Sequence, residues 1–92
     1  MGLYGRRKRE FLKEWYPEVL EEFEKDGTLE KYLEDTDRQA EEMRERLIER
    51  ITERDKHEIP DKELEPLKWA GIMQGIAMEA DSIVMRELIL TL

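Results

Sequence analysis

The sequence predicts an all-α protein: a three-helix antiparallel bundle with a kinked first helix and a long helical hairpin. Two long stretches have helical periodicity. Residues 28–56 carry one narrow apolar stripe between rows of charge, and residues 66–92 are apolar over most of the helix circumference. The composition agrees, because 43% of the residues are charged and only five are Gly and three Pro. A helix that is apolar nearly all round must be covered by other helices or by a partner.

The chain is expected to form one helical domain, 1–92, since 92 residues leave no room for a second core. It has no cysteine, which excludes disulfides and thiolate chemistry. The most apolar run, residues 83–92, is too short to span a bilayer and contains Arg86 and Glu87. No secretory signal follows the basic N-terminus. We therefore expect a cytoplasmic protein without membrane contact.

Residues 1–26 are expected to form the kinked first helix. Apolar side chains recur there at spacings of three and four: Phe11, Leu12, Trp15, Val19, Leu20 and Phe23. Pro17 interrupts the run, because proline lacks an amide hydrogen and disfavours helical geometry at Tyr16. The segment therefore bends there, or divides into two shorter helices. Gly27 suits the left-handed position that ends a helix.

The long charged helix is expected over residues 28–56, with Thr28 as N-cap. Its apolar seam alternates spacings of four and three through Leu29, Leu33, Thr36, Ala40, Met43 and Leu47.

The apolar C-terminal helix is expected over residues 61–92, with Asp61 as a good N-cap. Pro66 allows two versions: a short turn precedes it, or the main helix begins there with Glu65 as cap. Gly71 and Gly75 are four apart, a spacing of small residues that would let another helix approach closely.

The apolar faces of these helices together predict a core. Its expected members are Phe11, Trp15, Leu20, Phe23, Leu33, Ala40, Met43, Leu47, Trp69, Met73, Ile76, Ala80, Ile83 and Val84.

The inventory for catalysis is poor, so we expect no enzyme activity, no cofactor and no metal site. The chain has one histidine, His57, and one serine, Ser82, in segments far apart in the sequence. One histidine among the carboxylates of an acidic helix is typical of solvated surface rather than of a metal ligand set.

Three groups of residues are candidates for binding. The basic run Arg6, Arg7, Lys8 and Arg9 is a candidate nucleic-acid arm, although such a run more often solvates a helix face. The row Glu34, Asp37, Glu41, Glu45 and Glu49 is a candidate acidic face, which could imitate a phosphate backbone or simply be solvated. The surplus apolar positions Met73, Met85, Leu88, Ile89 and Leu92 are a candidate interface, with a homodimer as the favoured state.

Several short motifs, in order along nearly the whole chain, resemble the TnpV-like transposon-encoded proteins of bacterial mobile elements. They are Leu3-Tyr4-Gly5-Arg6-Arg7, Phe11-Leu12-Lys13-Glu14 with Pro17, Gly27-Thr28-Leu29 with Tyr32-Leu33, Asp37-Arg38-Gln39-Ala40, Glu45-Arg46-Leu47-Ile48-Glu49, Trp69-Ala70-Gly71-Ile72-Met73-Gln74, Ala80, Ile83-Val84 and Glu87-Leu88-Ile89. The resemblance implies a small helical cytoplasmic protein carried by a transposon or conjugative element. It implies no reaction.

Three functions remain open from the sequence. The first is a non-catalytic accessory protein of a mobile element that acts through protein–protein contacts. The second is an acidic inhibitor of a host nucleic-acid enzyme, of the anti-CRISPR or DNA-mimic type. The third is a recombination accessory factor that binds DNA through the basic arm. The net charge of the whole chain is −8, which disfavours nucleic-acid binding by the rest of the protein.

Overall fold

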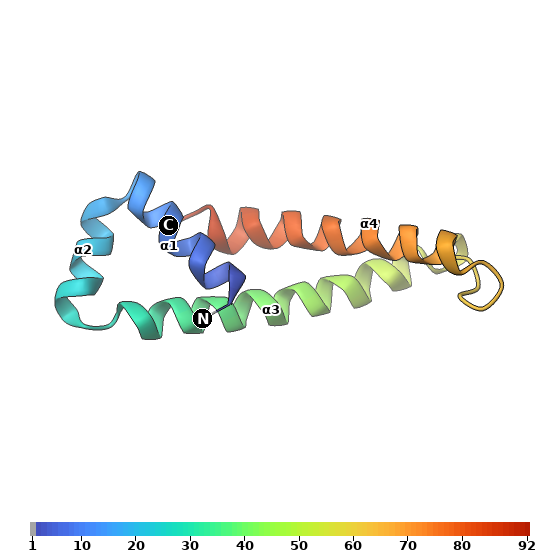
Figure 1. The fold of residues 1–92 in the computed structure, drawn as a ribbon, viewed down its shortest axis with the longest axis horizontal. Coiled ribbons are helices and arrows are strands. Elements are labelled where there is room, and N and C mark those ends of the chain that lie inside the picture. Colours follow the sequence, from blue (N-terminus) through green and yellow to red (C-terminus); the bar gives the residue numbers. More distant parts are fainter. Residues whose placement is uncertain (1) are drawn as a thin grey trace.

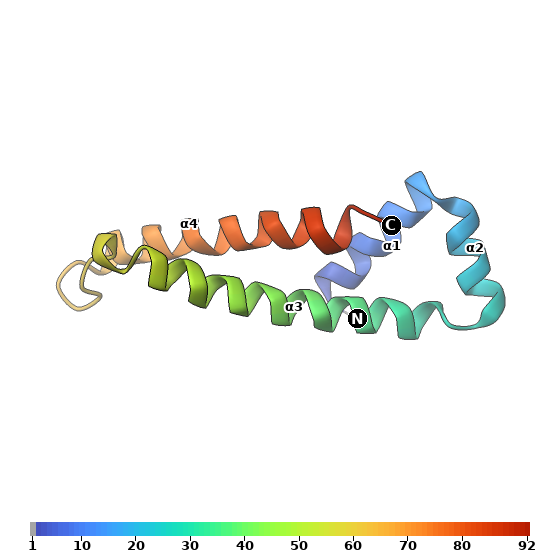
Figure 2. The same ribbon diagram turned by 180° about the vertical axis from the view of Figure 1, so that it is seen from behind.

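The computed structural model describes residues 2–92 and confirms an all-helical chain. Its elements in order are α1 (Leu3–Trp15), α2 (Pro17–Asp26), α3 (Leu29–Arg54), the 3₁₀ turn η1 (Lys56–Glu58), α4 (Pro66–Val84) and the π-helical turn η2 (Met85–Ile89). Helices α3 and α4 lie side by side and antiparallel along a molecule of 55 × 20 × 20 Å, and α1 crosses them at one end (Figure 1). The view from behind shows α2 closing the same end of the molecule (Figure 2).

The first segment consists of two helices, so the expectation of one kinked helix in a three-helix bundle is not confirmed. Tyr16 has φ −139° and ψ 59°, outside the helical region, and separates α1 from α2. Pro17 opens α2 at a position where an amide hydrogen would have no intrahelical acceptor. The break turns the chain, and α2 links the far end of α1 to the start of α3.

Gly27 ends α2 in the left-handed conformation, as predicted, with φ +71°. The amides of Gly27 and Thr28 donate to the carbonyl oxygens of Glu24 and Phe23 at 3.2 and 3.1 Å, which is a Schellman motif. Thr28 is the N-cap residue of α3, although its side chain makes no capping hydrogen bond. The turn therefore depends on the glycine backbone.

The last helix begins at Pro66, so the predicted range 61–92 is too long at its start. Asp61 Oδ1 instead accepts hydrogen bonds from the amides of Glu63 and Leu64, at 2.7 and 3.1 Å, and holds a turn before the helix. Glu65 occupies the N-cap position. Among residues 2–92, no helix combines the length and apolar character that crossing a bilayer requires.

The core has two parts, and α1 covers only one of them. Near α1 a cluster of buried residues comprises Tyr4, Ala40, Val84 and Ile89, and along the rest of the hairpin a second comprises Ile51, Ile76 and Ala80; Leu12, Leu20 and Leu33 are also buried. Helix α1 does not cover the second part, so Trp69 and Met73, predicted as core, remain only half-buried. The prediction of Trp15 as a core residue is wrong, because its side chain is 69% exposed.

Gly71 and Gly75 do not bring two helices close together, contrary to expectation. Both are exposed, and a Cβ atom at either position would meet nothing within 4 Å.

Replacing either glycine of α4 by alanine is therefore expected to raise the free energy of unfolding by about 1 kcal/mol, because alanine loses less backbone entropy in a helix. Urea denaturation followed by circular dichroism measures the change. Gly27→Ala is the matched control: it also has open space around it, but its φ of +71° makes a side chain unfavourable by about 1–2 kcal/mol. A gain in stability at Gly27, or a loss at both Gly71 and Gly75, would contradict this account.

Candidate functional site

A buried lysine fastens α1 to the end of the hairpin. Lys8 is 2% exposed, and its Nζ donates hydrogen bonds to the carbonyl oxygens of Leu88, at 3.1 Å, and Thr91. These oxygens lie at and just beyond the last helical turn, where carbonyls lack intrahelical donors and carry partial negative charge. Burial lowers the pKa of Lys8, because the ammonium has left water. The contact therefore closes a helix C-terminus with a side chain from another helix.

The first turn of α1 is capped by a side chain of α3. Gly2, at the N-cap position of α1, has no side chain that could accept a hydrogen bond. Asp37 Oδ1 instead accepts one from the Gly5 amide at 2.8 Å. A Cβ atom on Gly2 would lie 2.5 Å from Asp37 Oδ2, so the glycine leaves room for the carboxylate.

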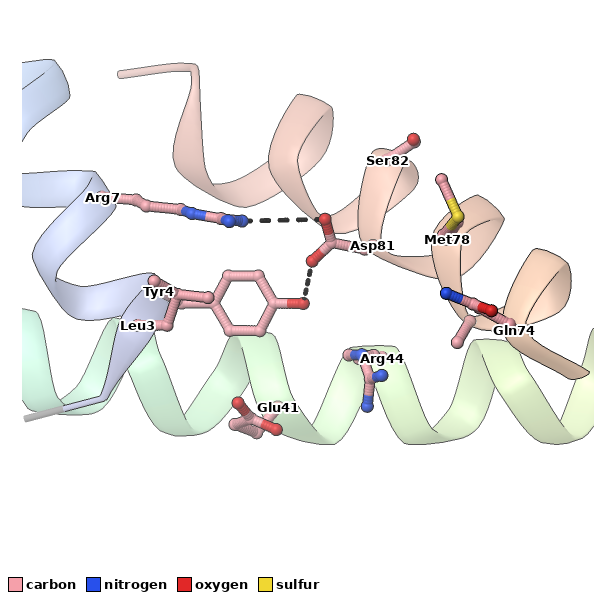
Figure 3. A pocket seen from close by; sticks show the side chains of 10 residues that line it. Leu3, Tyr4, Arg7, Glu41, Arg44, Gln74, Met78, Asp81 and Ser82 are labelled. Atoms are coloured by element: carbon pink, nitrogen blue, oxygen red, sulfur yellow. Dashed lines mark hydrogen bonds and ion pairs between the residues drawn. The ribbon is translucent and has the colours of Figure 1, made fainter. Parts of the chain in front are cut away.

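A third polar contact joins α1 to α4, where Tyr4 and Asp81 point toward each other (Figure 3). Tyr4 is almost fully buried, and its hydroxyl donates a hydrogen bond to Asp81 Oδ1. Asp81 Oδ2 also lies 3.7 Å from Arg7 Nη1. Burial first, and then the hydrogen bond and negative charge of Asp81, raises the pKa of Tyr4 above 10.0. At neutral pH Tyr4 is thus a proton donor in a hydrogen bond and not a phenolate nucleophile.

These residues line a groove of about 460 Å³ between α1, α3 and α4. Glu41 and Arg44 lie on its α3 side, and Gln74 and Met78 on its α4 side (Figure 3). Ser82 also lines the groove, whereas His57 is in η1 beyond the other end of α3, so the structure does not bring the serine and histidine together. Within residues 2–92, no three His, Cys, Asp or Glu side chains gather in a way that could hold a metal ion.

A second hollow lies at the bend between α1 and α2, and its lining is mostly apolar. Phe11, Trp15, Tyr16 and Leu90 surround a space of about 340 Å³; we call these four residues the elbow patch. The rings of Phe11 and Tyr16 lie 5.6 Å apart, and Trp15 projects into solvent. Contiguous exposed apolar groups of this kind mark interaction surfaces more often than isolated ones do.

The predicted basic arm is only partly available for binding. The prediction that Lys8 belongs to this arm is wrong, since its ammonium group is buried against backbone carbonyls. Arg7 is half-exposed and is engaged with Asp81 and with Met85 Sδ, at 3.4 Å. Arg6 is exposed and Arg9 half-buried.

The predicted acidic face largely reaches solvent. Glu34, Glu41, Glu45 and Glu49 are exposed along α3. The prediction of Asp37 as a free member of this row is wrong, because its carboxylate caps α1.

The predicted C-terminal interface is mostly turned inward. Ile89 is fully buried, and Met73, Met85 and Leu88 are partly buried against the core; among the five, Leu92 is exposed. The reason is that α1 lies across η2 and covers the apolar side that was predicted to bind a partner.

Sequence reasoning missed Tyr4 and Lys8 as residues of the α1 contact. A signal was present: Tyr4, Lys8 and Leu12 are spaced by four, so they share one helix face. Because lysine is charged, Lys8 was not expected on the buried face of α1.

Comparison with known proteins then shows the family. The family model described as transposon-encoded protein TnpV matches residues 1–89 of the 92-residue chain. The chain belongs to the TnpV family, and it is a transposon-associated protein. No curated protein and no solved structure shows a significant match to it.

Replacing Lys8 tests the α1 contact. We expect Lys8→Ala to lower the free energy of unfolding by about 2–4 kcal/mol, because the buried stem is lost and two carbonyl groups lose their donor. Lys8→Met keeps the stem and is expected to cost about 1–2 kcal/mol. Chemical denaturation measures both, and Arg6→Ala, at an exposed position of the same helix, is the control. Equal stability of Lys8→Ala and the unmodified protein would refute the role of the contact.

The raised pKa of Tyr4 predicts a loss of stability at alkaline pH. Above pH 10.0 the unfolded chain releases the phenolic proton while the folded protein keeps it, so folding becomes less favourable as the pH rises. The stability difference between the unmodified protein and Tyr4→Phe should therefore shrink by up to about 1.4 kcal/mol per pH unit above pH 10, while groups common to both proteins cancel. Urea denaturation at a series of pH values provides the measurement. A difference that stays constant up to pH 12 would show that Tyr4 ionises normally.

Proposed function

We propose that this TnpV protein is a non-catalytic, cytoplasmic accessory protein of its transposon and that it acts through protein–protein contacts at the elbow patch. The observation that carries the proposal is the exposure of Trp15 beside an apolar hollow. Large aromatic side chains in such positions supply much of the free energy of protein association, since they bury a large area at little conformational cost.

The position of the patch supports this proposal. Trp15 comes two turns after Lys8, on the face by which α1 packs against the hairpin, yet its side chain is 69% exposed and lines a hollow with Leu90, the residue after η2. The apolar face of α1 therefore continues beyond its intramolecular partner. Family membership links the chain to a transposon and is compatible with an accessory role.

The acidic inhibitor is a second candidate, because four carboxylates remain exposed in a row along α3. The DNA-binding alternative has less support. Lys8 is buried and Arg7 is paired with Asp81, so Arg6 and Arg9 alone remain of the basic run.

Affinity capture tests the proposal and separates it from the acidic alternative. The bait is the full chain, and the lysate contains the proteins of the transposon and a CRISPR effector, with bound proteins identified at low and high salt. We expect a specific protein to be retained at high salt, to be lost with Trp15→Glu, and to be kept with Leu67→Glu. Leu67 is the matched control, because it is 89% exposed at the opposite end of the molecule.

Two outcomes would contradict this function. Identical capture by the unmodified protein and Trp15→Glu would remove the elbow patch from the interaction. Capture of a nucleic-acid enzyme that is lost at high salt and on charge reversal at Glu41 and Glu45 would support the acidic inhibitor instead.

A further inference from the structure

We propose that the groove between α1, α3 and α4 binds a small organic acid, with Arg44 in contact with its carboxylate and Met78 in contact with its apolar part (Figure 3). This site is separate from the elbow patch, with which it shares no lining residue. The volume of the groove, about 460 Å³, lies within the range of about 300–1,000 Å³ that is usual for small-molecule sites.

Arg44 is a cation without a partner in this groove. It is half-buried, so its side chain has lost part of its contact with water. Glu41 lies one turn before it on α3, yet among residues 2–92 no ion pair and no side-chain hydrogen bond involves Arg44. Burial chiefly raises the pKa of Tyr4 and the charge of Arg44 opposes that rise, so Arg44 acts electrostatically on the Tyr4 hydroxyl in the groove. Its guanidinium is therefore available there for an anion.

The polar groups on the α1 side of the groove already bind one another. Asp81 Oδ1 accepts a hydrogen bond from Tyr4, and its Oδ2 lies 3.7 Å from Arg7 Nη1. Gln74 is different, because within residues 2–92 its amide makes no side-chain hydrogen bond. Figure 3 shows Gln74 on α4 and Arg44 on α3, on opposite sides of the groove. The planar fork of an arginine binds both oxygens of a carboxylate, and a glutamine N–H can donate to the same group.

The charges that line the groove favour a ligand with one negative charge. Two of the lining residues are basic, Arg7 and Arg44, and two are acidic, Glu41 and Asp81. Because Arg7 pairs with Asp81, one cation and one carboxylate remain without a partner. A carboxylate matches the charge of Arg44, whereas a phosphate monoester carries about 1.5–2 negative charges and would be repelled by Glu41. The lining therefore favours a monocarboxylate over a phosphate.

The rest of the lining provides a surface for an apolar group. Met78 is 64% exposed and Leu3 is 49% exposed, and Ala77 also borders the groove. Contact with an apolar group would remove these side chains from water, and methionine adapts its shape to such groups readily. The affinity for a carboxylate is therefore expected to rise with the length of its hydrocarbon chain.

Titration of the ¹⁵N-labelled full chain with sodium hexanoate at constant ionic strength, followed by NMR, tests the inference. We expect saturable shifts of the Arg44 Nε signal and of the amides of α3 and α4 beside the groove, with a dissociation constant on the order of 1 mM. Hexanamide has a similar shape without the charge and should bind at least about tenfold more weakly. Acetate lacks most of the apolar part and should bind at least about fivefold more weakly.

Variants of Arg44 test where the carboxylate lies. Arg44→Gln should raise the dissociation constant for hexanoate at least about tenfold, and Arg44→Lys, which keeps the charge without the planar fork, at least about threefold. Arg46→Gln is the matched control, because it is the same change at an exposed position of α3 that lines a different hollow, and it should have no effect. Circular dichroism checks that each variant is folded. Gln74→Ala, at an exposed position of α4, should also weaken binding and does not depend on the folding of the Arg44 variants.

Four results would overturn the inference. They are the absence of saturable shifts up to about 20 mM hexanoate, unchanged affinity in folded Arg44→Gln, equal affinity for hexanamide, and tighter binding of inorganic phosphate than of hexanoate. None of these results depends on Trp15, so the proposed function of the elbow patch is tested separately.

Discussion

The contact between Lys8 and the end of the C-terminal helix determines how α1 lies on the hairpin. The ammonium group is out of water, so its hydrogen bonds to Leu88 and Thr91 must persist for the folded state to be stable. The same bonds satisfy carbonyl oxygens that the helix itself leaves free. One side chain thus meets the polar requirements of two helices at once. A shift of α1 by one turn would leave both sets of groups unpaired.

The register set by Lys8 accounts for the remaining features of this end of the molecule. Tyr4 lies one turn before it and reaches Asp81, and Leu12 lies one turn after it in the core. Farther along the same face, Trp15 is 69% exposed and lines a hollow together with Leu90, the residue after η2. The exposed tryptophan therefore follows from the packing of α1, which uses its apolar face as far as the hairpin extends.

The distribution of charge makes this end of the protein unlike the rest. The positive helix α1 is followed directly by the negative helix α2, with aromatic side chains between them. The other exposed charges lie mostly along α3, where acidic and basic groups alternate and form local ion pairs such as those of Asp35 with Lys31 and Arg38. Such exposed pairs contribute little to stability. The elbow patch thus lies where the charge of the chain changes from positive to negative.

Local chemistry within the sequence determined the long helices and some of the points where they end. Apolar spacing predicted the long helices, Pro17 predicted the break near Tyr16, and Gly27 predicted the turn, because each effect depends on residues only a few positions apart. Which groups are buried was decided by the tertiary structure. Lys8 is buried and Trp15 is exposed, since the burial of each side chain of α1 depends on whether the hairpin packs against it. The role of Asp37 also depends on the tertiary structure: it caps the start of α1, which is 32 residues away in the chain.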